Sequence, residues 1–295
     1  MKALRLLVCA GWIATSVYGA PEAPPAGGGI QLLSDFSALG RLGFFSNQDD
    51  EFQDDRYVSE GTVLLDFDLL SVGERWSLWS RFGFVVDLGK SVADNLPFSP
   101  KEMAYEISPF VEYRREAYLY RFGWNHVCQH LIYKDHEEPW YVTAGSNAVP
   151  PDVYWNRLYL GAGRAEIRPE VFRETTFGPA PPRVLWYAEV GGYLQSFPGM
   201  ADDSLYGHND WVADAKADVR LRLLSGGKWA LFANSLTHVL LDGEDEFFTR
   251  EQLQLELAFA SQGYGSSIYA GWHVVDEHPR DGKEDMFEFG AAFYY

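Results

Sequence analysis

Three residue types that support nucleophilic catalysis lie on two neighbouring predicted strands of this chain. His126 and Cys128 are two residues apart, so in a strand both side chains point to the same face. Asn156 lies on the next predicted strand, beyond a long polar connection. A thiol acts as a nucleophile when an imidazole takes its proton and a third group orients that imidazole. The pattern therefore predicts Cys128 as nucleophile, His126 as base and Asn156 as the orienting group.

The composition indicates an exported protein of the bacterial outer membrane. Residues 1–20 carry Lys2 and Arg5 beside an apolar run too short to span a bilayer, which predicts a cleaved signal peptide. Aromatic residues make up 16% of the chain, and no later apolar run has the roughly 18 residues of a membrane helix. These features are typical of outer-membrane barrels. The net charge of −18 argues against nucleic acid as a partner.

Segments of strand type predict the fold. Residues 21–38 are rich in Pro and Gly and are expected to form a periplasmic lead-in, with the barrel at 39–295. In the third segment, apolar Phe82 and Phe84 alternate with polar Arg81. The 12 segments are 39–46, 57–71, 75–88, 102–114, 116–128, 153–165, 183–197, 209–223, 227–240, 248–261, 264–275 and 285–295. Their even number and alternation predict an all-β, 12-stranded antiparallel transmembrane β-barrel.

The connections predict which end of the barrel faces the cell. Membrane barrels have short periplasmic turns and longer outer loops, and the short connections here follow even-numbered segments, with 166–182 as the exception. The fifth segment then runs outward. Because Arg157 is expected in the lumen, its neighbour Asn156 should face lipid, and the same alternation places His126 and Cys128 outward. We therefore expect these three side chains at the level of the outer leaflet.

The residues around this trio resemble a known family. Residues 125–128, Asn-His-Val-Cys, followed by residues 154–159, Tyr-Trp-Asn-Arg-Leu-Tyr, are similar to the outer-membrane phospholipase A family. In that family an Asn-His-x-Ser-Asn-Gly motif precedes a Ser-Trp-Asn-Arg-x-Tyr motif on a 12-stranded barrel. The resemblance implies that Cys128, His126 and Asn156 stand where the family has its serine, histidine and asparagine. It also implies hydrolysis of acyl esters in outer-leaflet phospholipids.

The chain differs from the family's motifs at two places, and the motifs do not indicate which residues would bind the family's Ca²⁺. Cys128 replaces the serine, and Gln129 and His130 replace the Asn-Gly that follows it. Loss of a glycine amide that helps to hold the oxyanion would cost orders of magnitude in rate. The resemblance implies activation by Ca²⁺, for which the sequence offers only acidic neighbours. These are Asp135, Glu137, Glu138 and Asp152.

Other interpretations of the same residues remain open. His126 and Cys128 have a structural alternative, in which they only form hydrogen bonds at the membrane interface. They also share a face with His130, with His136 close by, and zinc or copper accepts such ligands. The acidic residues expected in the lumen could line a narrow pore, or they could pair with arginine side chains that fill the interior. Of these two alternatives we expect the filled interior. The alternative function is a catalytically silent structural barrel or narrow pore.

The sequence predicts two kinds of partner, the barrel assembly machinery and membrane lipids. The last segment is aromatic and ends at Tyr295, which resembles the signal by which the barrel assembly machinery recognises its substrates. Outer-membrane lipids are the other expected partner. The sequence leaves open whether two copies pair as a homodimer.

Overall fold

The computed structural model describes residues 29–46, 57–91, 96–131, 152–164, 182–194, 211–243, 245–260, 264–277 and 283–295. The predicted signal peptide, 1–20, lies outside these residues. The strands are β1 (Ile30–Leu32), β2 (Phe36–Ser46), β3 (Ser59–Val72), β4 (Trp76–Ser91), β5 (Leu96–Arg115), β6 (Tyr118–Leu131), β7 (Asp152–Arg164), β8 (Val184–Tyr193), β9 (Trp211–Ser225), β10 (Trp229–Asp242), β11 (Phe247–Ala260), β12 (Gly265–Asp276) and β13 (Phe287–Tyr294). In this described part of the chain, no helix is long and apolar enough to cross a membrane.

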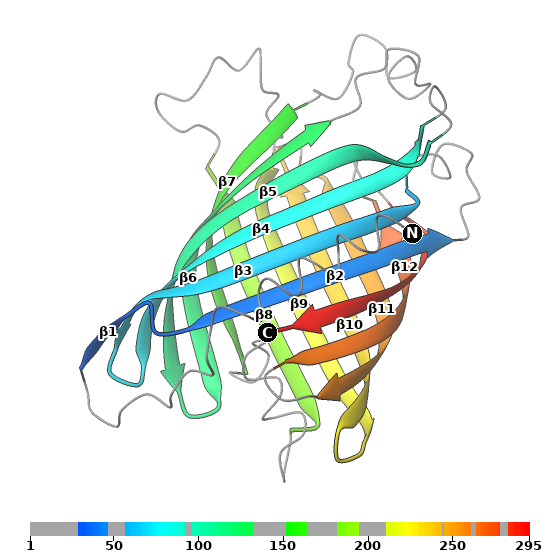
Figure 1. The fold of residues 1–295 in the computed structure, drawn as a ribbon. Helices are drawn as coiled ribbons and strands as arrows, with labels where there is room; N and C mark the ends of the chain where they lie inside the picture. Colours follow the sequence, from blue (N-terminus) through cyan, green and yellow to red (C-terminus); the bar gives the residue numbers. More distant parts are fainter. Residues whose placement is uncertain are drawn as a thin grey trace.

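Strands β2 to β13 close into one antiparallel barrel. Each strand pairs with its neighbours in the chain, and pairing of β2 with β13 closes the sheet, as Figure 1 shows. The short β1 adds to the free end of β3 beyond the start of β2, with Ile30 opposite Val72. The predicted all-β, 12-stranded antiparallel barrel is confirmed. Its first strand begins at Phe36, inside the stretch 21–38 that was expected to be lead-in.

Two strands run further than the sequence indicates. Residues 89–101 contain Pro97 and Pro100 and were expected to be an outer connection, yet β4 continues to Ser91 and β5 starts at Leu96. The register shifts between Asp87 and Leu88, where β5 has one extra residue. Such a bulge accommodates proline, which cannot donate a ladder hydrogen bond. The strand pair therefore extends past a composition typical of loops.

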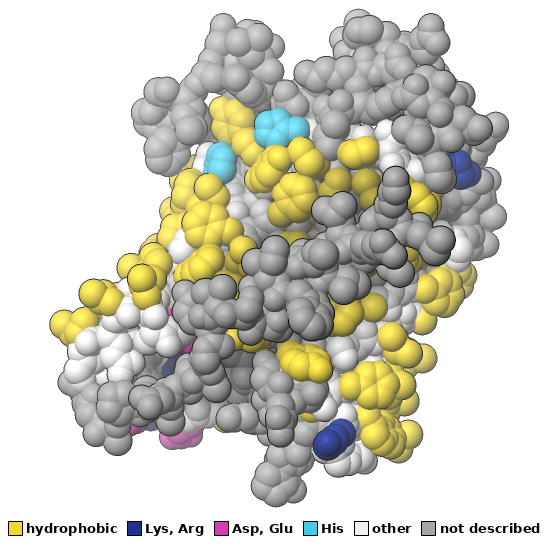
Figure 2. All heavy atoms as spheres, in the orientation of Figure 1, with side chains coloured by type: hydrophobic (Ala, Val, Ile, Leu, Met, Phe, Trp, Pro, Cys, Tyr) yellow, Lys and Arg dark blue, Asp and Glu magenta, His cyan; other side chains and the backbone are white. Residues whose placement is uncertain are grey.

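The two faces of the sheet carry opposite chemistry. On β4, Phe82 points outward and is 45% exposed, whereas Arg81 points inward and donates hydrogen bonds of 2.8 and 2.9 Å to Asp66. The same division runs around the wall, and Figure 2 shows hydrophobic side chains over much of the outer surface that is described. A closed barrel with an apolar outer wall and ion pairs inside is the architecture of outer-membrane proteins. The chain is a bacterial outer-membrane β-barrel, as the sequence predicted.

The lumen is packed with apolar side chains at its periplasmic end. One buried cluster contains Trp79 and Phe110, and another contains Leu185 and Phe232. These positions lie close to the short turns, which place them at the periplasmic side. Above them the lumen contains a cavity of about 600 Å³. Whether the rest of the lumen is filled, as we expect from the sequence, stays a prediction.

Candidate active site

The pairing of β6 with β7 brings the predicted trio together. The register is continuous from Tyr118, opposite Arg164, to His130, opposite Asp152. His126 is therefore directly opposite Asn156. Directly opposite residues on one face have Cβ atoms about 5 Å apart, which lets their side chains interact.

The lumen contacts of β7 determine which way the trio faces. Arg157 points inward and is 2% exposed, donating from Nε to Asp214 at 2.6 Å and from Nη1 to Glu189 at 2.7 Å. On β6, Asn125 also points inward and donates to Glu106 at 2.7 Å. Because neighbouring residues of a strand face opposite sides, the side chains next to Arg157 and Asn125 lie on the outer wall. The trio is therefore on the membrane side, as expected.

The trio has the connectivity of a nucleophile, a base and an orienting group. His126 Nδ1 lies 2.9 Å from Asn156 Oδ1, and His126 Nε2 lies 3.6 Å from Cys128 Sγ. An amide oxygen only accepts hydrogen bonds, so this contact places the imidazole proton on Nδ1 and leaves the lone pair of Nε2 toward the thiol. Asn156 is 2% exposed, which holds its amide in place. The arrangement can move a proton from sulfur to nitrogen.

Two aromatic rings lie close to the imidazole. The Trp124 ring is stacked at 5.7 Å from the His126 ring, with 24° between the planes, and the Tyr154 ring lies 6.3 Å away. On the other neighbouring strand, Ile107 is opposite His126 and is 43% exposed. Cys128 is half-buried. The thiol therefore lies in an apolar, lipid-facing setting near the outer ends of β6 and β7.

A break in the β5–β6 ladder beside this site was not apparent from the sequence. The register runs from Ile107, opposite His126, to Phe110, opposite Gly123, and skips the two residues between them. One of the two is Pro109, which has no N–H to donate. The Ser108 hydroxyl instead donates to the Trp124 carbonyl at 3.1 Å. This bond fixes the backbone next to His126, and the serine before a proline was the only sequence signal for it.

The backbone after Cys128 is paired with both neighbouring strands of the sheet. Gln129 pairs with Ala104 on one side and with Val153 on the other, and the ladder continues through His130. In a strand with neighbours on both sides, backbone N–H groups are used by the ladder. The substitution of the family's Asn-Gly therefore coincides with a regular strand, which offers no turned backbone amide to an oxyanion.

The residues considered for a metal do not form a described cluster. In the described parts of the chain, no group of three or more His, Cys, Asp or Glu side chains is arranged to hold a metal ion. His130 faces outward and its ring lies 5.9 Å from Tyr105. His136, Asp135, Glu137 and Glu138 lie outside the described residues, and the Asp152 side chain is not described. The described side chains thus do not fit a calcium site.

Comparison with known proteins locates the chain only at the level of the fold. No protein-family model matches the sequence, and no curated protein matches it. Solved structures similar to it include outer membrane phospholipase A from Escherichia coli, at 13% identity and a TM-score of 0.46, covering 88% of this chain and 92% of that one. The Salmonella typhi phospholipase dimer with bound calcium has the same identity and score and covers 88% and 90%.

A protein of another kind is about as similar. The KdgM porin in complex with disordered oligogalacturonate matches at 8% identity and a TM-score of 0.43, covering 88% of this chain and 98% of the porin. Likenesses at this level do not distinguish a hydrolase from a porin. Activity must therefore be argued from the chain's own residues.

Proposed function

We propose that the chain is a phospholipase-A-like acyl hydrolase of the outer membrane. The observation that supports this most directly is the pair of contacts on His126, at 2.9 Å to Asn156 and 3.6 Å to Cys128. A histidine with one ring nitrogen fixed by an amide and the other facing a thiol is the arrangement that activates a cysteine nucleophile.

The reaction follows from these contacts. His126 Nε2 takes the thiol proton, and the sulfur of Cys128 attacks the ester carbonyl carbon. As the carbon–oxygen bond breaks, the leaving lysophospholipid oxygen receives the proton from His126, and a thioester remains on Cys128. A water molecule, deprotonated by His126, then attacks the thioester and releases a fatty acid and the free thiol. Asn156 keeps the imidazole in the tautomer that both steps need.

The substrate class follows from the position of the site. The trio faces the membrane near the outer ends of the strands, so an ester bond at the headgroup boundary of the outer leaflet lies at its level. Exposed apolar side chains continue from the site toward the middle of the wall, including Ile107 and Leu158. Acyl chains would lie against this surface, which supports phospholipid as the substrate.

The test is hydrolysis of phospholipid in mixed micelles by the refolded chain, with calcium or with a chelator. Native protein should release fatty acid, His126→Ala should not, and Cys128→Ser should retain part of the activity because serine occupies the family's nucleophile position. Absence of turnover in both the native chain and the serine variant, under both conditions, would refute the enzyme. A difference between calcium and chelator decides the calcium expectation separately.

A catalytically silent barrel is the second candidate, and the ladder at Gln129 favours it. With no free backbone amide after Cys128, the oxyanion must be held by side chains, and loss of one donor costs about 10²–10³ in rate. Planar-bilayer recordings test the narrow-pore form of this candidate. Because the buried apolar clusters that contain Trp79 and Phe232 lie inside the periplasmic end of the lumen, we expect no steady conductance.

The C-terminal residues are the part of the chain that concerns assembly of the barrel. Tyr295 continues the pairing of β13, donating to the Ala38 carbonyl at 2.9 Å and accepting from the Ala38 N–H at 3.0 Å. We propose that the aromatic end segment is recognised by the barrel assembly machinery. Removal of Tyr295 should then slow insertion by that machinery in vitro. Cross-linking in liposomes tests for a homodimer.

A further inference from the structure

The cavity in the lumen is separate from the proposed active site. Its volume of about 600 Å³ lies in the range of small-molecule binding sites. Its lining contains none of the trio, which lies on the opposite face of the wall. The apolar side chains around Trp79 and Phe232 lie at the end of the lumen below it.

The positive charges of the lining are already neutralised. Each Lys or Arg that lines the cavity lies within 4.0 Å of a carboxylate, and the loosest, Lys216, is 3.8 Å from Glu189. The other pairs are Arg81 with Asp66, Arg157 with Asp214 and Glu189, Arg250 with Asp276, and Lys283 with Glu60 and Asp87. An anionic ligand would therefore have to displace an existing ion pair.

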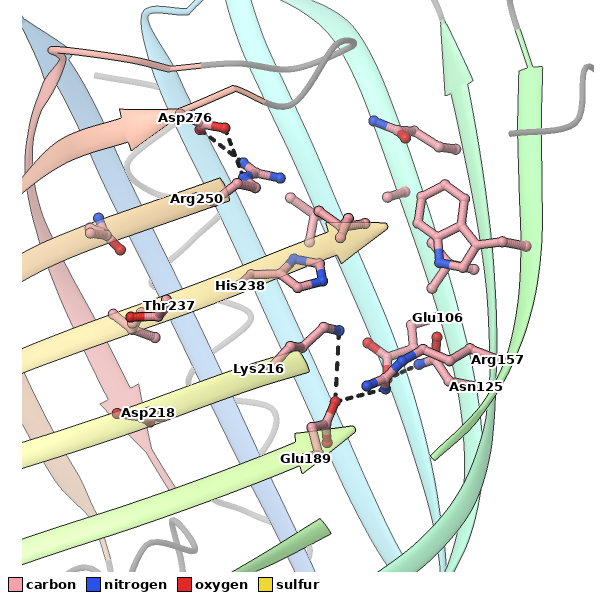
Figure 3. A pocket seen from close by; sticks show the side chains of 18 of the residues that line it. Glu106, Asn125, Arg157, Glu189, Lys216, Asp218, Thr237, His238, Arg250 and Asp276 are labelled. Atoms are coloured by element: carbon pink, nitrogen blue, oxygen red, sulfur yellow. Dashed lines mark hydrogen bonds and ion pairs between the residues drawn. The ribbon is translucent and has the colours of Figure 1, made fainter. Parts of the chain in front are cut away.

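Carboxylates of the lining that lie outside these ion pairs include Glu106, Asp218 and Glu251. Glu106 accepts a hydrogen bond from the neutral amide of Asn125 at 2.7 Å, and the nearby Arg81 guanidinium donates to Asp66 instead. No ion pair joins Glu106 or Asp218 to any Lys, Arg or His among the described residues. Figure 3 shows Glu106 next to the paired Arg157, and Asp218 apart from that group on another strand. The cavity lining thus has more Asp and Glu than Lys and Arg side chains, a surplus of negative charge that a cationic ligand would offset.

We propose that the cavity binds a small organic polycation, a molecule with two or more ammonium groups. Glu106 is on β5 and Asp218 is on β9, with three strands between them, and neighbouring strands are about 4.8 Å apart. The two carboxylates therefore enter the cavity from different parts of the wall, and a molecule with two ammonium groups offers one to each. Trp155 and Tyr187 also line the cavity and offer aromatic rings for an ammonium group.

The test is calorimetric titration of the refolded full chain with spermidine and with 1,5-diaminopentane at low salt. Saturable binding is expected for both amines. Glu106→Gln and Asp218→Asn should each weaken binding about tenfold, because each removes one charge-assisted contact while keeping the shape of the side chain. Glu246→Gln, at an exposed residue outside the cavity, is the matched control and should bind like the native chain. Far-UV circular dichroism verifies the fold of each variant.

Specific outcomes would overturn the proposal. Polyamines are also attracted to any acidic surface, and this chain carries −18. If the double variant of Glu106 and Asp218 binds spermidine as the native chain does, the binding is surface attraction only. Displacement of the diamine by equimolar Mg²⁺ would indicate a metal site, and binding of glutarate in place of the diamine would indicate an anion site. Either result refutes a polycation site, whatever the hydrolysis assay shows.

Discussion

Replacing Asn156 by alanine separates a catalytic trio from a structural hydrogen bond. A hydrogen bond between Asn156 and an uncharged imidazole is worth about 0.5–1.5 kcal/mol. When His126 takes the thiol proton, the same contact becomes a bond to a charged ring, worth about 1.5–3 kcal/mol. Only the difference, about 1–1.5 kcal/mol, stabilises the transition state. Asn156→Ala should therefore lower kcat about five- to thirteenfold.

The measurement is kcat and KM for phospholipid in mixed micelles, with KM expected to change little because Asn156 is only 2% exposed. Asn234→Ala is the matched control, since Asn234 is also buried and donates to Glu256 at 2.9 Å, on a strand away from the site. It should cost stability and leave kcat unchanged. Equal kcat in native chain and Asn156→Ala, or equal losses in both variants, would refute the orienting role.

Two further predictions concern the stability of the barrel, measured by urea unfolding in vesicles. Arg157→Met should lower the free energy of unfolding by about 3–5 kcal/mol, because it leaves the carboxylates of Asp214 and Glu189 buried without their guanidinium partner; a loss below 1 kcal/mol would contradict a buried network. Trp79→Ala should cost about 3–5 kcal/mol, because Trp79 is 1% exposed in the apolar layer, whereas Trp76→Ala on the outer face of the same strand should cost clearly less.

The sequence predicts the fold well because alternation is a local property. A strand such as β4 shows its two faces in its own residues, so the barrel and the outward direction of His126 and Cys128 follow without any tertiary information. The extent of β5 was underestimated because Pro97 and Pro100 resemble a loop, and a bulge that accommodates proline depends on the partner strand. The local pattern of residues thus predicts which face of the sheet a side chain lies on better than it predicts where a strand begins or ends.

The contacts of the site needed the structure. That His126 lies opposite Asn156 depends on the register of β6 and β7, which pattern alone does not determine across a long connection. The inward partners of Arg157 come from β8 and β9, far along the chain, and no spacing rule pairs them. The amide ladder at Gln129 is likewise visible only once both neighbouring strands are in place.

The outward direction of the trio determines the kinetics that an enzyme of this kind would show. A lipid can reach Cys128 by lateral diffusion within the leaflet, and products can leave by the same route. The concentration that governs the rate is then the mole fraction of substrate in the surrounding film, not its amount per volume. Diluting the phospholipid with inert detergent at constant bulk concentration should slow turnover, whereas adding buffer should not.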